Sequence, residues 1–288
     1  MKMLRYFMIF CLLTLGNLVA NSQKSILTID SLISSEKLLK SLGDSIINGS
    51  TDFSRNGAAA EFNPRFFDLL ANPETFNYPF DSIKTVSILK SPDGLMRIYT
   101  WIVPSRIEGT FKYYGVVQRI NIKTGEMKLI GLVELKSIPE EAELAELKYD
   151  TWFGAIYYEI IEKNIGKNKY YFLLGWQGND RLTTRKLIDV IYFDSWNNLT
   201  FGAPVFKDET KKLKQRVIFE YTTEAVMLLR YEKKKKMIVF DHLSPSSPSL
   251  KGQYRYYGPD FTYDAYHFKK GFWNYRKNLE MRNSNDSK

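Results

Sequence analysis

Residues 166–193 read GKNKYYFLLGWQGNDRLTTRKLIDVIYF, and this stretch decides the fold class. It contains two runs rich in Leu, Ile, Val, Tyr and Phe, with a Gly- and Asn-containing loop at 175–181 between them. A turn signal, Gly166-Lys167-Asn168, precedes the first run. Apolar runs of this length joined by short turns are typical of antiparallel hairpins. The stretch therefore predicts two neighbouring β-strands.

The same pattern continues on both sides of this stretch, from Ile83 onward. Further turn signals are Pro92-Asp93-Gly94, Lys123-Thr124-Gly125-Glu126, Asn197-Asn198 and Lys269-Lys270-Gly271. Counting the runs between them predicts about a dozen strands. The regular hairpin spacing predicts a mainly β (α+β) protein whose antiparallel strands form a sandwich, a barrel or propeller-like sheets. The chain shows no repeat of fixed period, which argues against a regular propeller.

The residues before the β-rich region are predicted to be helical. Apolar residues return at three- and four-residue spacing between Ile26 and Ile47, as on one face of a helix. Asn63 followed by Pro64 predicts the capped start of a second helix. Residues 48–51 and 55–57 are rich in Gly, Asn and Ser or Thr and are interpreted as connecting loop.

Four segments are expected along the chain. They are a signal peptide at 1–22, an N-terminal helical segment at 23–80, a β-rich domain at 81–280 and a disordered tail at 281–288. Within the β-rich domain, the acidic Ala/Leu segment Pro139–Leu147 is expected to form a short helix, because proline favours the first helical position. If the domain subdivides, the boundary is expected near 136–150.

The first residues predict export from the cytoplasm. Basic residues at Lys2 and Arg5 precede a short apolar core and then small residues, which is the pattern of a cleaved secretory signal. The apolar core is too short to span a bilayer, so no transmembrane segment is expected after cleavage, and the product is expected to be periplasmic or extracellular. The alternative is an uncleaved hydrophobic anchor. The single cysteine, Cys11, would leave with the signal, which excludes disulfides and thiol chemistry from the mature chain.

The chain has a moderate excess of positive charge. The net charge is +9, and removal of Lys2 and Arg5 with the signal peptide leaves +7. Lysines concentrate at 211–214 and 233–236. These runs are interpreted as solvated hairpin tips that discourage aggregation, or as contacts for an anionic partner such as a polysaccharide, a lipid headgroup or a nucleic acid. No nucleic-acid-binding motif accompanies them, so a nucleic-acid partner is not expected.

The loop after the first apolar run is the first candidate binding site, because loops at strand ends are where binding groups gather. A tryptophan there can stack on a sugar or another flat ligand while amides and charges donate or accept hydrogen bonds. The residues proposed for this role are Trp176, Gln177, Asn179, Asp180 and Arg185. The alternative is that Gly175 and Gly178 allow a tight turn and that the tryptophan fills the core.

A second candidate cluster contains one of the two histidines of the chain and nearby aspartates. Its members are Asp241, His242, Asp260 and Asp264. No H-E-x-x-H spacing and no calcium-binding loop accompanies them, so no metal is expected. A histidine within an aromatic strand is more often a packing residue than a ligand.

Catalytic motifs are scarce. The chain has no G-x-S-x-G elbow and no phosphate-binding glycine loop, so neither serine catalysis of that type nor a nucleotide cofactor is expected. A non-catalytic binding or structural module is therefore favoured. The alternative is a hydrolase acting on a glycan or another extracellular polymer with two facing carboxylates. Those would come from Asp180, Asp189, Asp194, Glu220, Glu224, Asp241, Asp260 and Asp264.

Several short motifs resemble those of uncharacterised secreted proteins of Bacteroidota. The motifs are Tyr78-Pro79-Phe80-Asp81-Ser82, Ser91-Pro92-Asp93-Gly94, Arg97-Ile98-Tyr99-Thr100-Trp101, Leu174-Gly175-Trp176 through Asp180 with Thr184-Arg185-Lys186, Phe240-Asp241-His242-Leu243 and Tyr257-Gly258-Pro259-Asp260. The resemblance covers most of the chain from about Phe62. It implies an exported envelope or secreted protein, and it supplies no reaction. Independently of the resemblance, a glycan or an envelope protein is the expected partner.

Overall fold

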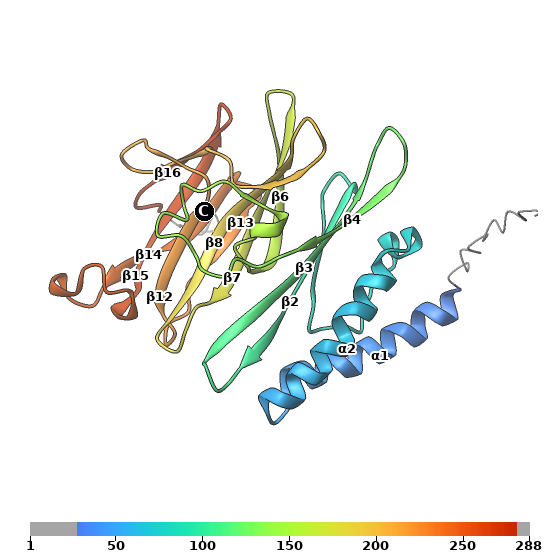
Figure 1. Cartoon of the computed structure of the whole chain (residues 1–288). Helices are drawn as coiled ribbons and strands as arrows, with labels where there is room; N and C mark the ends of the chain where they lie inside the picture. The colour runs from blue at the N-terminus through green and yellow to red at the C-terminus, as the bar shows by residue number, and fades with distance from the viewer. Residues whose placement is uncertain (1–27, 281–288) are drawn as a thin grey trace, which may run out of the picture.

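The computed structural model describes residues 28–280, in which a helical layer and three β-sheets stack face to face (Figure 1). A separate apolar core fills each of the three spaces between neighbouring layers. The predicted mainly β (α+β) class with an N-terminal helical segment is confirmed. The expected signal peptide (1–22) and tail (281–288) lie outside the described residues. Within 28–280, no helix is long and apolar enough to cross a membrane.

The three sheets are named here by their position in the stack. The helix-side sheet has the order β1-β2-β3-β4 and contains β1 (Ser87–Lys90), β2 (Met96–Ser105), β3 (Thr110–Ile120) and β4 (Met127–Leu132). The central sheet has the order β5-β9-β8-β7-β6, with β12 also paired to β8, and contains β5 (Leu147–Lys148), β6 (Ile156–Ile165), β7 (Asn168–Gly178), β8 (Thr183–Phe193), β9 (Leu199–Phe201) and β12 (Val217–Thr222).

The outer sheet completes the stack. It has the order β11-β10-β16-β15-β14-β13 and contains β10 (Phe206–Lys207), β11 (Leu213–Lys214), β13 (Leu229–Glu232), β14 (Met237–Pro245), β15 (Tyr257–Lys269) and β16 (Phe272–Arg276). In the three sheets the strands pair antiparallel, apart from β10, which is parallel to β16. Short 3-10 helices lie at η1 (Pro73–Asn77), η2 (Tyr149–Thr151), η3 (Pro248–Leu250) and η4 (Tyr254–Tyr256). The two- and three-residue strands raise the number of strands above the predicted dozen.

Two helices cover the free face of the helix-side sheet, α1 (Ile29–Asn48) and α2 (Asp52–Leu70). The predicted start of the second helix at Asn63 is wrong, because Thr51 caps α2 through a reciprocal capping box with Ser54. Residues 55–57, predicted as loop, lie within the helix, and so does Pro64. The physical reason is a continuous buried stripe at three- and four-residue spacing. This stripe consists of Arg55, Ala59, Phe62, Phe66 and Leu70.

The acidic Ala/Leu segment Pro139–Leu147 is a series of turns, and the predicted short helix is wrong. Tertiary contacts take the carbonyl groups that a helix would have used. The buried guanidinium of Arg216 donates to the carbonyl oxygens of Ala142 and Ala145, the latter at 2.7 Å. The backbone N–H of Gln215 donates to the carbonyl oxygen of Glu143 at 2.7 Å. These tertiary hydrogen bonds attach the segment to the central sheet in an irregular conformation and outweigh its helix propensity.

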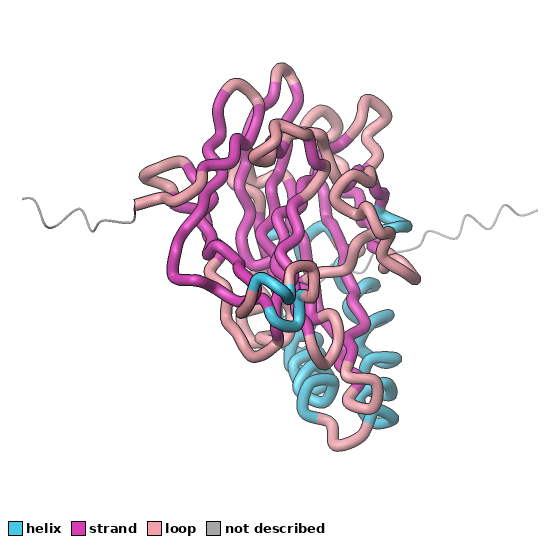
Figure 2. The backbone as a smooth tube through the Cα atoms, turned by 90° about the vertical axis from the view of Figure 1, so that its left-hand side faces the viewer, coloured by secondary structure: helices cyan, strands magenta, loops and turns pink. Residues whose placement is uncertain are grey.

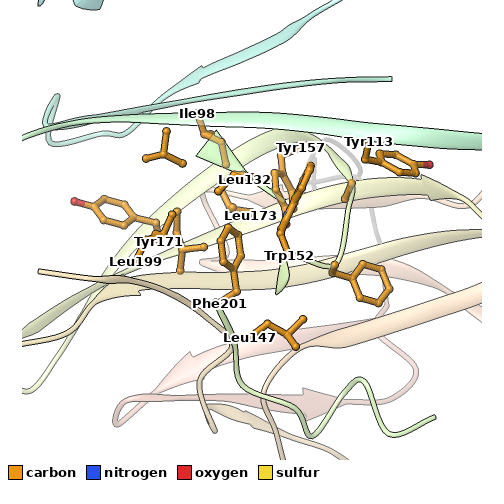
Figure 3. Close-up of a cluster of buried hydrophobic side chains, with 14 of the residues drawn as sticks. Ile98, Tyr113, Leu132, Leu147, Trp152, Tyr157, Tyr171, Leu173, Leu199 and Phe201 are labelled. Carbon is orange, nitrogen blue, oxygen red and sulfur yellow. The ribbon is translucent and has the colours of Figure 1, made fainter. Parts of the chain in front are cut away.

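The core between the helix-side and central sheets consists of packed apolar and aromatic side chains (Figure 3), and a chain of buried polar groups borders it. The indole N–H of Trp152 donates to the Tyr157 hydroxyl at 2.9 Å, and that hydroxyl donates to Asp189 at 2.9 Å. Asp189 also accepts from Arg216 Nε at 3.2 Å, and neither of these two side chains is exposed. Because buried polar groups need partners, this chain ties β6, β8 and the start of β12 to one another.

Candidate functional site

An open groove of about 630 Å³ lies where β2 turns into β3, β7 turns into β8, and β12 ends. The β7–β8 turn is the loop that the sequence indicates as the first candidate binding site. Trp176 and Asp180, two of the residues proposed there, line the groove. The surface that the lining exposes is mainly apolar, and hydroxyl and charged side chains also border it, a combination that ligand sites use.

Trp176 forms an aromatic wall of the groove together with Phe111. Its indole N–H donates to Thr184 Oγ1 at 2.8 Å, which fixes the ring. The ring of Phe111 meets it edge to face, with 5.3 Å between centroids and 74° between planes. Gly178 makes this contact feasible, because a Cβ there would lie only 2.3 Å from Phe111 Cε2. The indole is therefore held in place before any ligand arrives.

Lys186 lies beside Trp176 on the same face of the central sheet, because these two residues are register partners on β7 and β8. Its side chain is half-buried, lines the groove, and extends over the ring of Tyr158 with Nζ 5.1 Å from the centroid. Burial lowers the pKa of this ammonium, and the charge of nearby Asp241 opposes the change. A cation thus stands next to a flat indole.

The two turns that frame the groove are fixed by carboxylates. Asp180 Oδ1 accepts the backbone N–H groups of Leu182 at 2.7 Å and Thr183 at 2.8 Å, which folds the β7–β8 turn on itself. On the other side, Asp52 at the start of α2 accepts from Ser105 Oγ at 2.9 Å and from the Arg106 N–H at 3.0 Å. Hydrogen bonding led by the Arg106 N–H holds the pKa of Asp52 well below its usual range.

The groove is positively charged. Arg106, Arg181 and Lys186 line it, and Asp180 is the one acid among the described lining residues. Arg181 spans the two framing turns, since its Nη2 donates to the Ile107 carbonyl oxygen at 2.6 Å. An anionic group of a ligand would therefore be favoured here over a cationic one.

The other residues proposed at this loop lie on the opposite face of the sheet or in the turn. Arg185 donates from Nε to Glu220 at 2.7 Å and from Nη1 to the Gln177 side-chain oxygen at 3.1 Å. Asn179 donates to Thr183 Oγ1 at 2.8 Å. This network borders a second depression, which Arg185 and Glu220 line with the 138–144 turns. Side chains alternate along a strand, so Trp176 and Gln177 cannot serve the same site.

The second proposed cluster is partly assembled. His242 Nδ1 lies 2.6 Å from Asp264 Oδ2, and the buried Asp264 also accepts from the Tyr275 hydroxyl. On the other side of the ring, His242 Nε2 is 4.0 Å from Asp260 Oδ2. Asp241 is engaged elsewhere, since its carboxylate accepts the N–H of Leu228 at 2.7 Å.

This histidine cluster lacks a positioned nucleophile. An aspartate on Nδ1 orients a histidine as in hydrolytic triads, but the nearby Ser244 hydroxyl donates to Asp260 at 2.8 Å. Across residues 28–280, no group of three or more His, Cys, Asp or Glu side chains is arranged to hold a metal ion. The arrangement can tie β14 to β15 and β16, which is a structural role.

The remaining acids considered for glycan hydrolysis are dispersed. Asp189 is buried with Arg216, and Asp194 accepts backbone N–H groups of its own loop from Trp196 and Asn198. Glu220 is paired with Arg185, while Glu224 is exposed after β12. Each paired acid is held by its own partners, and Asp180 is the single carboxylate among the described residues that line the groove beside Trp176.

Several residues that line the groove with Trp176 could not be singled out from the sequence alone. Phe111, Tyr221 and Val226 come from other parts of the chain, and Val226 is 87% exposed. Lys186 could have been recognised from the sequence as a candidate site residue. Side chains alternate along a strand, so residues 184 and 186 lie on one face and residue 185 on the other. Comparison of the sequence with protein-family models, with curated proteins and with solved structures finds no match.

Proposed function

We propose that this chain is an exported, non-catalytic binding protein whose ligand occupies the groove beside Trp176. The ligand class is a flat-faced molecule that carries an anionic group, and an acidic glycan is the representative that agrees best with the expected periplasmic or extracellular location. The proposal combines the export signal expected at residues 1–22 with the chemistry of the groove.

The observation that carries the proposal is the placement of Trp176 and Lys186 side by side on neighbouring strands. An indole supports the apolar face of a sugar ring, and an ammonium that is half-desolvated interacts more strongly with a carboxylate than one in water. Both groups are held by contacts that exist without ligand, which reduces the entropy lost on binding.

The competing function, hydrolysis by two facing carboxylates, receives less support. That chemistry needs two carboxyl groups roughly 5 to 10 Å apart on either side of the scissile bond. The described lining of the groove offers Asp180 alone, and both of its oxygens take part in hydrogen bonds of the β7–β8 turn.

An array of neutral and acidic glycans probed with the purified protein tests the proposal. We expect binding to acidic members, strong loss in Trp176→Ala, and no change in Trp196→Ala, since Trp196 is 83% exposed and lies outside the groove. Failure of the native protein to bind any glycan, or equal binding by Trp176→Ala, would overturn the proposal. Release of shortened glycan by the native protein would favour the hydrolase instead.

A further inference from the structure

The end of the molecule opposite the groove is formed by turns from all three sheets, and we call it the basic end. β7 runs from Asn168 at the basic end to Gly178 at the groove. Figures 1 and 2 both show several hairpin tips projecting together at the upper end of the molecule. The turns that form the basic end are 91–95, 121–126, 166–167, 194–198, 233–236 and 269–271.

Contacts between the sheets hold these turns together. From the central sheet, Lys169 donates to Asp93 of the helix-side sheet at 2.6 Å. Close by, the guanidinium of Arg119 lies 3.3 Å from the centroid of the Phe193 ring. Toward the outer sheet, Gly271 lies so near Ile165 that a Cβ on the glycine would be 3.2 Å from Ile165 Cγ2. Met237, directly after the 233–236 turn, pairs with His267 of β15, so this turn lies beside the 269–271 turn and the six turns form one surface.

This surface is rich in exposed lysine. The exposed lysines of the six turns are Lys123, Lys167, Lys233, Lys234, Lys235, Lys236, Lys269 and Lys270. The same turns contain three acids, and each has a local partner. Asp93 is paired with Lys169, Asp194 accepts hydrogen bonds within its own loop, and the exposed Glu126 accepts from the Thr124 hydroxyl at 3.1 Å. The basic end thus has a clear surplus of positive charge.

Two large apolar side chains project from the same turns. Trp196 is 83% exposed in the turn after β8, and Ile122 is 77% exposed in the turn after β3. Large apolar side chains that project among exposed lysines are suited to a partner that is both anionic and apolar. Tryptophan in particular favours the boundary between lipid headgroups and acyl chains.

We infer that the basic end docks on an anionic lipid bilayer, with the lysines at the headgroups and with Trp196 and Ile122 inserted between them. A bilayer fits better than a soluble polyanion because the apolar tips would gain nothing from a hydrophilic chain. The exposed lysines are also spread over separate turns. An ammonium acts as a point charge without the bidentate geometry of arginine, and lysines dispersed in this way suit a surface of many headgroups. Docked in this way, the protein would present the groove away from the membrane.

Cosedimentation of purified protein with lipid vesicles tests this inference. We expect binding to vesicles of phosphatidylcholine mixed with phosphatidylglycerol, little binding to phosphatidylcholine alone, and loss of binding at high salt. Lys233→Glu with Lys234→Glu should reduce binding about tenfold or more, since each reversal turns attraction into repulsion at the headgroups. The matched control is Lys37→Glu with Lys251→Glu, which makes the same change of net charge at exposed residues on α1 and in the loop after η3.

Insertion of Trp196 into the bilayer is tested separately. We expect tryptophan fluorescence of the native protein to shift to the blue when anionic vesicles are added, and Trp196→Ser should abolish this shift and reduce partition into the vesicles. Equal loss in the control double variant would overturn the inference, because net charge alone would then explain binding. Binding to heparin without binding to vesicles would also overturn it and would assign the basic end to a soluble polyanion. Because glycan binding is measured without lipid, failure here leaves the groove proposal standing.

Discussion

Asp189 and Arg216 form an ion pair that is fully buried in the core against the central sheet, with 3.2 Å between Arg216 Nε and Asp189 Oδ1. Asp189 also accepts from the Tyr157 hydroxyl, and Arg216 donates to the 139–147 turns. The pair thus joins β8, β6, the start of β12 and an irregular segment at one point.

The first prediction concerns this pair. Asp189→Asn removes the charge that compensates the buried Arg216 guanidinium, and loss of one partner of a buried pair costs about 3–5 kcal/mol. Urea unfolding should show a decrease of that size in the free energy of unfolding. Glu224→Gln, at an exposed acid, is the control and should change stability by less than about 0.5 kcal/mol. A similarly small effect of Asp189→Asn would contradict the structural role given to the pair.

The pairing of Asp189 with Arg216 could not be predicted from the sequence. The run Leu187–Phe193 is apolar apart from Asp189, and a strand buried on both faces reads in this way. The sequence predicts the strand, but nothing in it distinguishes Asp189 from the other acids considered for glycan hydrolysis. Its partner Arg216 lies in another part of the chain, and only the tertiary fold brings the two together.

The second prediction concerns pH. Burial alone would raise the pKa of Asp93, but hydrogen bonds from Lys169, Ser91 and Tyr171 outweigh burial and lower it to about 2. The pKa of an aspartate in the unfolded chain is about 3.9. Ionised Asp93 therefore stabilises the fold above about pH 4, and this contribution is lost as the pH falls toward about 2. Asp93→Asn should therefore cost about 1–2 kcal/mol at neutral pH.

Unfolding of both proteins at a series of pH values checks this. The difference in the free energy of unfolding between native protein and Asp93→Asn should disappear near pH 2. Asp150→Asn, in the exposed η2 turn, should differ little from the native protein at any pH. A difference for Asp93→Asn that is the same at neutral and acidic pH would show that the charge of Asp93 is not the cause.

The third prediction tests where α2 begins. Thr51 accepts the N–H of Ser54 at 3.1 Å, and loss of such a cap costs about 1 kcal/mol. Thr51→Ala should lower the free energy of unfolding by that amount, whereas Ser50→Ala next to it should have little effect. If the helix began at Asn63, as the sequence suggested, then Asn63→Ala would show the loss of a cap and Thr51→Ala would not.

The fourth prediction links pH to ligand binding. The pKa of Lys186 is lowered by burial, so its ammonium loses its proton at a lower pH than an exposed lysine does. Affinity for an acidic ligand should therefore fall as the pH is raised toward about 10.4, the pKa of an ordinary lysine, and the fall should begin at a lower pH than it would for an exposed lysine. In Lys186→Gln, the affinity should be lower and nearly independent of pH over that range. The same pH dependence in both proteins would contradict the role of Lys186.

The candidate site was predictable only in part. The turn signals around Trp176 placed a loop at the end of a strand, and the structure puts this loop at the rim of a groove. The register between β7 and β8, which brings Lys186 beside Trp176, depends on the length of the turn and on the burial of each face. Phe111, which completes the aromatic wall, comes from the helix-side sheet, and its position follows from the stacking of sheets.

The central claim is that the groove beside Trp176 and Lys186 binds an acidic, flat-faced ligand. Calorimetric titration of the best glycan from the array into four proteins tests it most directly. These are native protein, Trp176→Ala, Lys186→Gln and Trp196→Ala. We predict that the first two variants bind about tenfold or more weakly, in line with the loss of one aromatic contact or one charge-assisted hydrogen bond, and that Trp196→Ala binds as the native protein does. Equal affinity in all four proteins would contradict the claim.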